Sequence, residues 1–126
     1  MRKPRILIID DEPGLIRVMT LMLTKSHRYE VHSVTDATKA LEAVVKLKPD
    51  LVLLDWIMPH LCGGDVAQQI RADSRVGHTP ILVLSAVVLQ RDRMKELAGY
   101  PAIAKPIGVH ELVEAIEAQL CEARRV

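Results

Sequence analysis

Short apolar runs alternate with stretches of helical spacing along the chain, and this alternation limits the possible folds more than any other feature. Runs rich in Ile, Val and Leu predict strands at Ile6–Ile9, Tyr29–Val34, Leu51–Leu54 and Ile81–Leu84, with a weaker fifth at Ala102–Ala104. Apolar residues recur at helical spacing after each run, and Met94 and Leu97 mark the fourth such stretch. Because parallel strands need long crossovers, this order predicts an α/β fold with a single doubly wound, five-stranded parallel sheet.

The composition favours one globular domain spanning residues 1–126. Hydrophobic residues make up 49% and charged residues 26% of the chain, unlike the polar composition of disordered proteins. The net charge of +1 gives no general attraction to nucleic acid or to an anionic membrane. The apolar runs are too short to span a membrane, and the two cysteines are expected to be reduced thiols, so we expect a cytoplasmic protein.

Polar residues follow four of the five predicted strands, at the point where each strand ends. Asp10, Asp11 and Glu12 follow the first strand, Asp55 the third, Ser85 the fourth, and Lys105 with Pro106 the fifth. Taken singly, each has a simple structural explanation, such as a helix start, a turn or a surface ion pair. The carboxyl ends of parallel strands share one edge of the sheet, however, and clustered carboxylates repel one another unless a cation lies among them. Together these residues predict a binding site.

The residue types indicate the chemistry of this site. Clustered carboxylates favour magnesium, a hard cation that takes oxygen ligands and keeps waters that a phosphate can displace. Asp55 is the candidate nucleophile, because a carboxylate can accept a phosphoryl group and form an acyl phosphate. Lys105 offers a positive charge, and Ser85 a hydroxyl donor, to the oxygens of that phosphoryl group.

At these residues the chain resembles the receiver domains of two-component response regulators. The resemblance covers nearly the whole chain and rests on Asp10-Asp11, Asp55-Trp56-Ile57-Met58-Pro59 with Gly64, Ser85-Ala86 and Lys105-Pro106. It implies a flavodoxin-like (βα)5 fold with the strand order 2-1-3-4-5. It also implies that Asp55 is the phosphoacceptor, with Ser85 and Lys105 as its catalytic partners. The implied ligands of Mg2+ are Asp10, mainly through water, Asp11, Asp55 and the backbone carbonyl of Ile57.

The same resemblance implies a signalling function rather than that of a classical enzyme. A receiver domain takes a phosphoryl group from a sensor histidine kinase or a histidine phosphotransfer protein and later hydrolyses the acyl phosphate. Its change of conformation controls an output domain or a downstream protein. Direct contact of this domain with nucleic acid or a membrane is not expected, whereas a phosphorylation-dependent homodimer is compatible with the resemblance.

One departure from the receiver pattern concerns how the signal leaves the site. The family usually carries, three residues before the lysine, an aromatic side chain that turns inward on activation, and here Ala102 stands three residues before Lys105. The nearest aromatic residue is Tyr100, followed by Pro101, whose fixed φ restricts the loop. We therefore expect Ser85 to respond to the phosphoryl group while Tyr100 stays passive.

A second departure concerns the lifetime of the phosphorylated form. By resemblance, Ile57 and Val87 occupy the positions that flank the path of the attacking water. Both side chains are apolar and branched, so neither can orient a water molecule by hydrogen bonding. The sequence therefore predicts a long-lived acyl phosphate.

Other functions fit the residues less well. A phosphatase with an aspartyl nucleophile needs a second Asp two residues later, where this chain has Ile57. A nucleotide-binding module needs a glycine-rich loop after the first strand, where Asp10-Asp11-Glu12-Pro13-Gly14 stands. A degenerate receiver usually lacks an acid, the hydroxyl or the lysine, and none is missing here. The five histidines show no ligand spacing for zinc on one predicted helix, and Cys62-Gly63-Gly64 is interpreted as a flexible loop.

Overall fold

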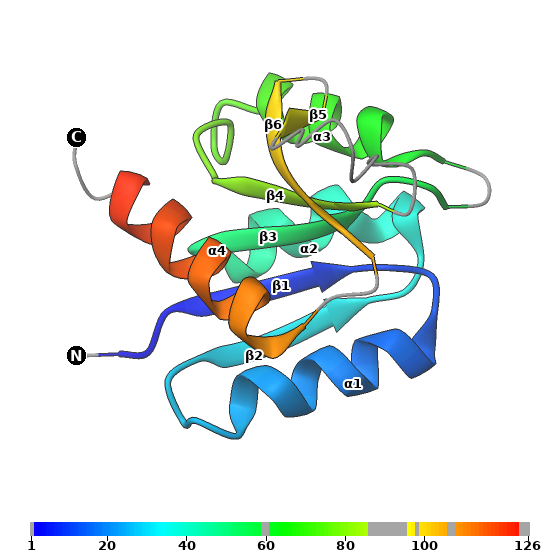
Figure 1. Ribbon diagram of the computed structural model, residues 1–126. Helices are drawn as coiled ribbons and strands as arrows, with labels where there is room; N and C mark the ends of the chain where they lie inside the picture. Colours follow the sequence, from blue (N-terminus) through cyan, green and yellow to red (C-terminus); the bar gives the residue numbers. More distant parts are fainter. Residues whose placement is uncertain (1, 59–60, 86–95, 98, 106–107, 124–126) are drawn as a thin grey trace.

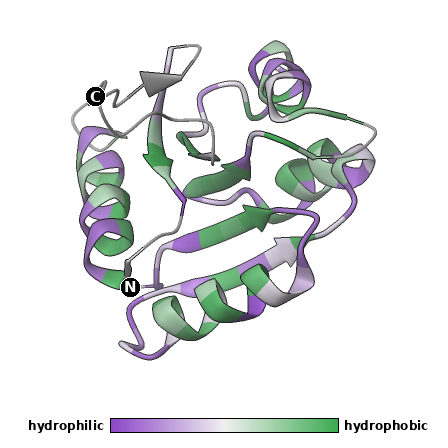
Figure 2. Cartoon of the chain, turned by 45° about the vertical axis from the view of Figure 1, so that its right-hand side comes forward, coloured by the Kyte–Doolittle hydropathy of each residue, from purple (hydrophilic) through white to green (hydrophobic). Residues whose placement is uncertain are grey.

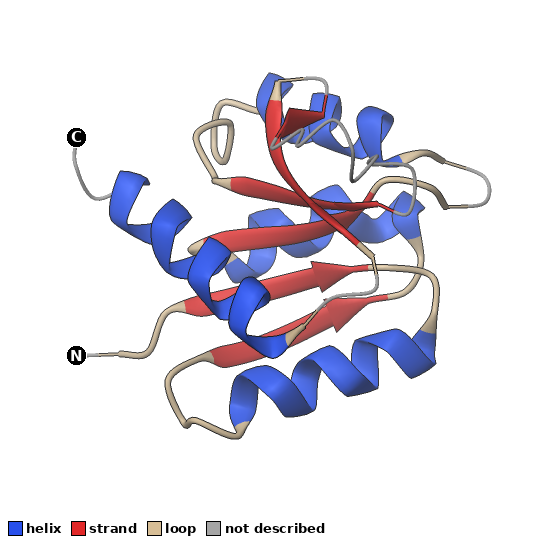
Figure 3. Ribbon diagram, viewed as in Figure 1, coloured by secondary structure: helices blue, strands red, loops and turns tan. Residues whose placement is uncertain are grey.

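The computed structural model describes residues 2–58, 61–85, 96–97, 99–105 and 108–123, which form one sheet with helices on both faces (Figure 1). The strands are β1 (Arg5–Ile9), β2 (Glu30–Val34), β3 (Leu51–Asp55), β4 (Ile81–Ser85), β5 (Glu96–Leu97) and β6 (Tyr100–Ala104). The described helices are α1 (Pro13–Thr24), α2 (Ala40–Leu47), α3 (Gly63–Ala72) and α4 (Val109–Ala123), with the short 3-10 helix η1 (Ala37–Lys39) before α2 (Figure 3). Within these ranges, no helix combines the length and apolar character that crossing a membrane requires.

The strand order of the sheet is β2-β1-β3-β4-β6-β5. Neighbouring strands from β2 to β6 pair in parallel. The prediction of five parallel strands in the order 2-1-3-4-5 is therefore confirmed, with β6 as the fifth strand. The structure adds β5, which pairs with β6 in the antiparallel direction at the edge of the sheet.

The helix predicted from the spacing of Met94 and Leu97 is wrong at Leu97. This residue lies in β5, opposite Tyr100, while Met94 falls outside the described residues. Gly99 stands between the two paired residues and has a φ of 88°. Glycine adopts this left-handed conformation without steric cost, so a turn at Gly99 reverses the chain where the apolar spacing indicated a helix.

Helices bury both faces of the central strands β1, β3 and β4, which explains why their sequences are almost continuously apolar, whereas the edge strand β2 contains polar residues. Leu53 and Leu54 are neighbours in β3 and both are fully buried, yet they belong to opposite faces. Leu53 belongs to the cluster that includes Ile116 of α4, and Leu54 to the cluster that includes Ile70 of α3. Figure 2 shows the hydrophobic colouring of the central strands between the helical layers. Two-sided burial of this kind is typical of parallel sheets.

Candidate functional site

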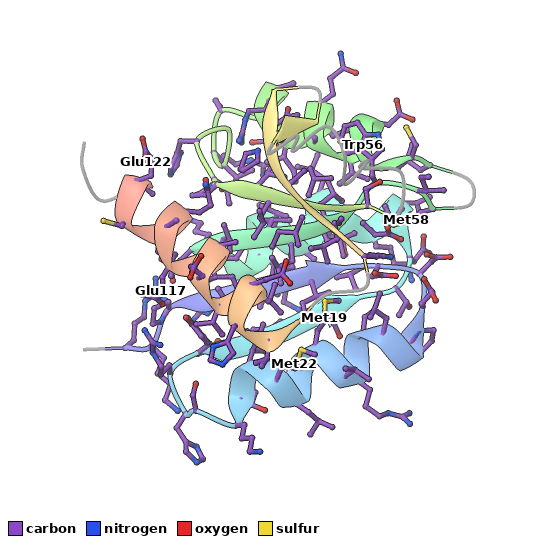
Figure 4. The ribbon with its side chains drawn as sticks, viewed as in Figure 1. Met19, Met22, Trp56, Met58, Glu117 and Glu122 are labelled. Carbon is purple, nitrogen blue, oxygen red and sulfur yellow. The ribbon has the colours of Figure 1, made fainter. Side chains whose placement is uncertain are left out.

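Backbone hydrogen bonds extend the sheet past its strand ends and position the residues that follow. Three amides at this edge donate to carbonyls of neighbouring segments: Asp10 to Val34 (3.1 Å), Trp56 to Leu84 (3.0 Å) and Lys105 to Ser85 (3.1 Å). Asp55 is the last residue of β3, directly before Trp56, which Figure 4 labels together with Met58 of the following loop. The structure thus brings Asp10, Asp55, Ser85 and Lys105 to one edge of the sheet, as the parallel topology predicts.

Four acidic side chains meet at this edge. One carboxylate oxygen from each of Asp10, Asp11, Glu12 and Asp55 lies within 4.8 Å of the others. Asp10 is 0% and Asp55 3% exposed, whereas Glu12 is exposed. The cluster therefore contains the three carboxylates expected to bind metal and also Glu12, which was expected at the same strand end but not as a metal ligand. The position of Glu12 directly after Asp10 and Asp11 in the sequence is what indicates that it lies in the cluster.

The ammonium group of Lys105 lies among these carboxylates. Its Nζ donates a hydrogen bond to Oδ1 of Asp55 at 3.1 Å. The same atom lies 3.6 Å from Oδ2 of Asp10 and 3.7 Å from Oε1 of Glu12. Because the described residues place this single ammonium group among four carboxylates, the ionised cluster keeps a negative potential that attracts a further cation.

Burial works against the charged forms of the two buried acids. Burial, with the charge of Asp10 next, raises the pKa of Asp55 to about 6, and Lys105 offsets only part of this rise. Burial also raises the pKa of Asp10, despite a hydrogen bond from the Glu12 amide. For Lys105, burial lowers the pKa, but the hydrogen bond to Asp55 and the surrounding negative charges outweigh burial and leave the pKa raised. An additional cation would therefore favour the ionised acids.

Asp10 has a buried oxygen without a hydrogen-bond partner. Its Oδ1 accepts a hydrogen bond from the amide of Glu12 at 2.9 Å. Its Oδ2 has no such partner among the described residues and lies beyond hydrogen-bond distance from Lys105. A buried carboxylate oxygen without a hydrogen bond is costly, and the ammonium group of Lys105 at 3.6 Å compensates it only in part, so a further cation would stabilise it. Since the donors are carboxylate oxygens, the residues fit a hard divalent cation such as magnesium.

The other predicted site residues lie on β4 and on the loop after β3. Ser85 is fully buried at the end of β4 and is paired in the ladder with Ala104, the residue before Lys105. Ile57 follows Asp55 by two positions and is 57% exposed. A metal ligand role for the Ile57 carbonyl stays a prediction. Four residues of the sequence pattern lie outside the described residues: Pro59, Ala86, Val87 and Pro106.

The loop after Asp55 packs tightly against the start of α3. The Gly63 amide donates to the carbonyl of Trp56 at 2.8 Å. A Cβ atom on Gly63 would lie 2.6 Å from the carbonyl oxygen of Asp55 and 2.7 Å from Cα of Trp56, so only glycine fits. The interpretation of Cys62-Gly63-Gly64 as a flexible loop is therefore wrong, since Gly63 is buried and begins α3. Because glycine lacks a Cβ atom, α3 can begin at Gly63 in close contact with the backbone of Asp55.

Tyr100 packs between two side chains near this loop. Its ring centroid lies 6.4 Å from that of Trp56, with the planes inclined by 50°. The central carbon of the Arg71 guanidinium group, Cζ, lies 5.4 Å from the centroid of the Tyr100 ring. Arg71 also donates a hydrogen bond to the carbonyl of Thr79 at 2.7 Å. Tyr100 and Ala102 both pack against the same core cluster, as alternate residues of a strand do.

Known proteins resemble this chain in sequence over almost its whole length. Residues 6–117 match the family described as the response regulator receiver domain. The chain is 32% identical over 125 residues to the DNA-binding dual master transcriptional regulator RpaA of Synechocystis sp., covering 98% of this chain and 52% of that protein. It is 37% identical over 123 residues to the DNA-binding response regulator MtrA of Mycobacterium tuberculosis, covering 94% of this chain and 51% of that protein. The chain thus spans about half the length of the curated relatives it matches.

A solved structure shares the architecture as well. The receiver domain of sensor histidine kinase PA1611 from Pseudomonas aeruginosa is 30% identical, with a TM-score of 0.82 over 95% of this chain and 99% of that chain. It is described with a magnesium ion coordinated in the active site cleft. The similarity therefore extends from the sequence to the arrangement of strands and helices.

Proposed function

The chain belongs to the response regulator receiver domain family, and from this premise we propose that it accepts a phosphoryl group on Asp55 in a magnesium-dependent reaction and thereby switches a partner. The observation that carries the proposal is the contact between Lys105 and Asp55 inside a cluster of four carboxylates. A nucleophilic carboxylate, a cation-binding group of acids and a lysine for the phosphoryl oxygens are together what such a transfer requires.

Asp55 is the nucleophile of the transfer. One of its carboxylate oxygens forms a bond to the phosphorus of a phosphohistidine on the donor protein. The phosphorus–nitrogen bond breaks at the same time, and the imidazole leaves with that electron pair. Lys105 exchanges part of its contact with Asp55 for hydrogen bonds to the transferring group, and Ser85 donates its hydroxyl from the neighbouring strand.

Asp10, Asp11 and Asp55, together with the backbone carbonyl of Ile57, would hold the Mg2+ ion. The buried Oδ2 of Asp10, which lacks a hydrogen-bond partner among the described residues, supports this assignment, because a cation would compensate it. Bound there, magnesium supplies positive charge to the oxygens of the phosphoryl group. The acids themselves favour the reaction by drawing that cation to the edge of the sheet where Asp55 lies.

Hydrolysis ends the signal. Water attacks the phosphorus of the acyl phosphate, the bond between phosphorus and the Asp55 oxygen breaks, and inorganic phosphate leaves as the carboxylate is restored. While the phosphoryl group is present, it attracts the hydroxyl of Ser85. This attraction differs between the two states, so it can shift the equilibrium between conformations.

The proposed phosphoryl donor is a sensor histidine kinase or a histidine phosphotransfer protein, and the responder is an output domain or a downstream protein. RpaA and MtrA are DNA-binding proteins, but the net charge of +1 supports a domain that does not itself contact nucleic acid. We place residues 1–126 in the cytoplasm as one receiver domain, without membrane contact and able to form a phosphorylation-dependent homodimer.

The test is incorporation of labelled phosphate from acetyl phosphate in the presence of magnesium. The wild-type protein should be labelled, and Asp55→Asn should abolish the label because the nucleophile is gone. Asp65→Asn, at an exposed acid on α3, is the matched control and should be labelled normally. Removal of magnesium with EDTA should also prevent labelling. Full labelling of the Asp55→Asn protein would overturn the assignment.

A further inference from the structure

Glu12 has no role in the proposed reaction, although its carboxylate reaches into the site. Its Oε1 lies 3.7 Å from Nζ of Lys105, and it belongs to the acidic cluster. The side chains of Asp10 and Asp55 are 0% and 4% exposed, whereas that of Glu12 is 63% exposed. Glu12 therefore forms the solvent side of a cluster whose centre is buried.

Within the part of the chain that the structure describes, the Glu12 side chain has no capping role at the start of α1. Glu12 stands at the N-cap of α1, where a polar side chain commonly accepts a hydrogen bond from the first turn, yet it makes no capping bond. Its backbone is fixed, because its amide donates to Oδ1 of Asp10 at 2.9 Å. The side chain thus extends from an anchored backbone toward Lys105.

Lys105 has two roles that conflict. It is proposed to contact the transferring phosphoryl group, yet it also occupies carboxylate oxygens at the proposed metal site. Its ammonium group contacts oxygens of Asp55 and Asp10, which the proposed metal would also use. The Lys105 side chain is only 17% exposed, so an ammonium group that loses these contacts needs another partner. A poorly solvated charge without a partner is costly. The carboxylate of Glu12 is such a partner, on the side of the cluster that faces solvent.

We propose that Glu12 is a positioning residue that draws Lys105 away from Asp10 and Asp55 when a divalent cation binds. This inference rests on the proposed function and deepens it. Lys105 stays paired throughout, first mainly with Asp55 and then with Glu12, and so remains close to the transferring group. Glu12 thereby strengthens magnesium binding through the lysine, without being a ligand of the ion.

Magnesium binding without any phosphoryl donor tests this role. Trp56, the only tryptophan, directly follows Asp55, so its fluorescence can report the titration. Glu12→Gln keeps the length of the side chain but loses its charge, and we expect about three- to tenfold weaker binding. Glu12→Asp keeps the charge but is shorter, and should also weaken binding. The matched control, Glu114→Gln at an exposed site on α4, should bind like the wild type.

A double-mutant cycle that combines Glu12→Gln with Lys105→Met distinguishes an effect of Glu12 through Lys105 from a direct effect of its charge on magnesium binding. If Glu12 acts through Lys105, the loss caused by Glu12→Gln should fall to less than about twofold in the Lys105→Met background. If Glu12 is merely a fixed charge or a ligand, removal of Lys105 leaves its charge uncompensated, and the loss should be as large or larger. That outcome, or wild-type affinity of Glu12→Gln, would overturn the inference alone. A wild-type protein that binds no magnesium would overturn the proposed function as well.

Discussion

Replacement of Asp55 by the uncharged, isosteric Asn should stabilise the fold at neutral pH. The pKa of Asp55 is raised from 3.8 to about 6, with burial as the main cause. Between about pH 3.8 and about pH 6, Asp55 is protonated in the folded protein but ionised in the unfolded chain. The stability contributed by this proton is complete below about pH 3.8 and is lost as the pH rises through about 6.

The size of the effect follows from the same pKa values. A rise from 3.8 to about 6 corresponds to about 3 kcal/mol. The Asp55 side chain is 4% exposed, so solvent screens its charge little. The hydrogen bond that Lys105 donates to the ionised Asp55 is already contained in this pKa, as one of the causes that lower it. We therefore expect Asp55→Asn to raise the free energy of unfolding by about 3 kcal/mol at pH 7.5 and to change it little near pH 4.

Urea unfolding followed by far-ultraviolet circular dichroism measures these differences. Wild type, Asp55→Asn and the control Glu114→Gln should be compared from about pH 4 to 7.5 in EDTA, where the control should follow the wild type. Magnesium should reduce the advantage of Asp55→Asn, because a cation that binds the folded wild type stabilises it. The reasoning would be refuted if Asp55→Asn raised the free energy of unfolding equally at both ends of the pH range. It would also be refuted if this variant were less stable than wild type at pH 7.5.

Three further predictions concern packing, lifetime and signal output. Gly63→Ala should lower the free energy of unfolding by about 1–3 kcal/mol, because the added methyl group would lie 2.6 Å from the Asp55 carbonyl oxygen; an unchanged Tm would contradict this. Ile57→Asn should shorten the lifetime of the phosphorylated protein by orienting the attacking water, and equal or slower loss of label would count against it. Tyr100→Ala should preserve the effect of a beryllofluoride phosphoryl mimic on self-association or partner affinity, whereas Ser85→Ala should reduce it. The opposite pattern would show that the aromatic switch has moved to Tyr100.

The five parallel strands could be predicted to within one or two residues, and β1, β3 and β4 most clearly, because helices cover both faces of these three strands. Each buried strand must then be a continuous apolar run, and the first charged residue marks its end. Asp10 and Asp55 stand out for this reason. Their meeting at one edge follows from the parallel topology rather than from any spacing in the sequence.

Other features depend on distances between distant backbone segments, which no local pattern records. The fit of Gly63 depends on how closely α3 approaches the backbone of Asp55. The strand at Leu97 depends on pairing across Gly99, which apolar spacing does not reveal. The contact of Glu12 with Lys105 joins the loop after the first strand to the residue that follows the last strand. These features required the three-dimensional structure.

The strand order also suggests a folding route. β1, β2 and β3 are consecutive in the chain and adjacent in the sheet, so residues 5–55 can pair before β4 and then β6 join the free edge (Figure 1). Such an intermediate would hold Asp10 and Asp55 together, whereas Lys105 arrives only with the last strand. The repulsion between the carboxylates of Asp10 and Asp55 would then slow folding until a cation is present. We expect magnesium to accelerate refolding in stopped-flow experiments, and an unchanged rate would indicate that the two acids meet only after Lys105 has joined them.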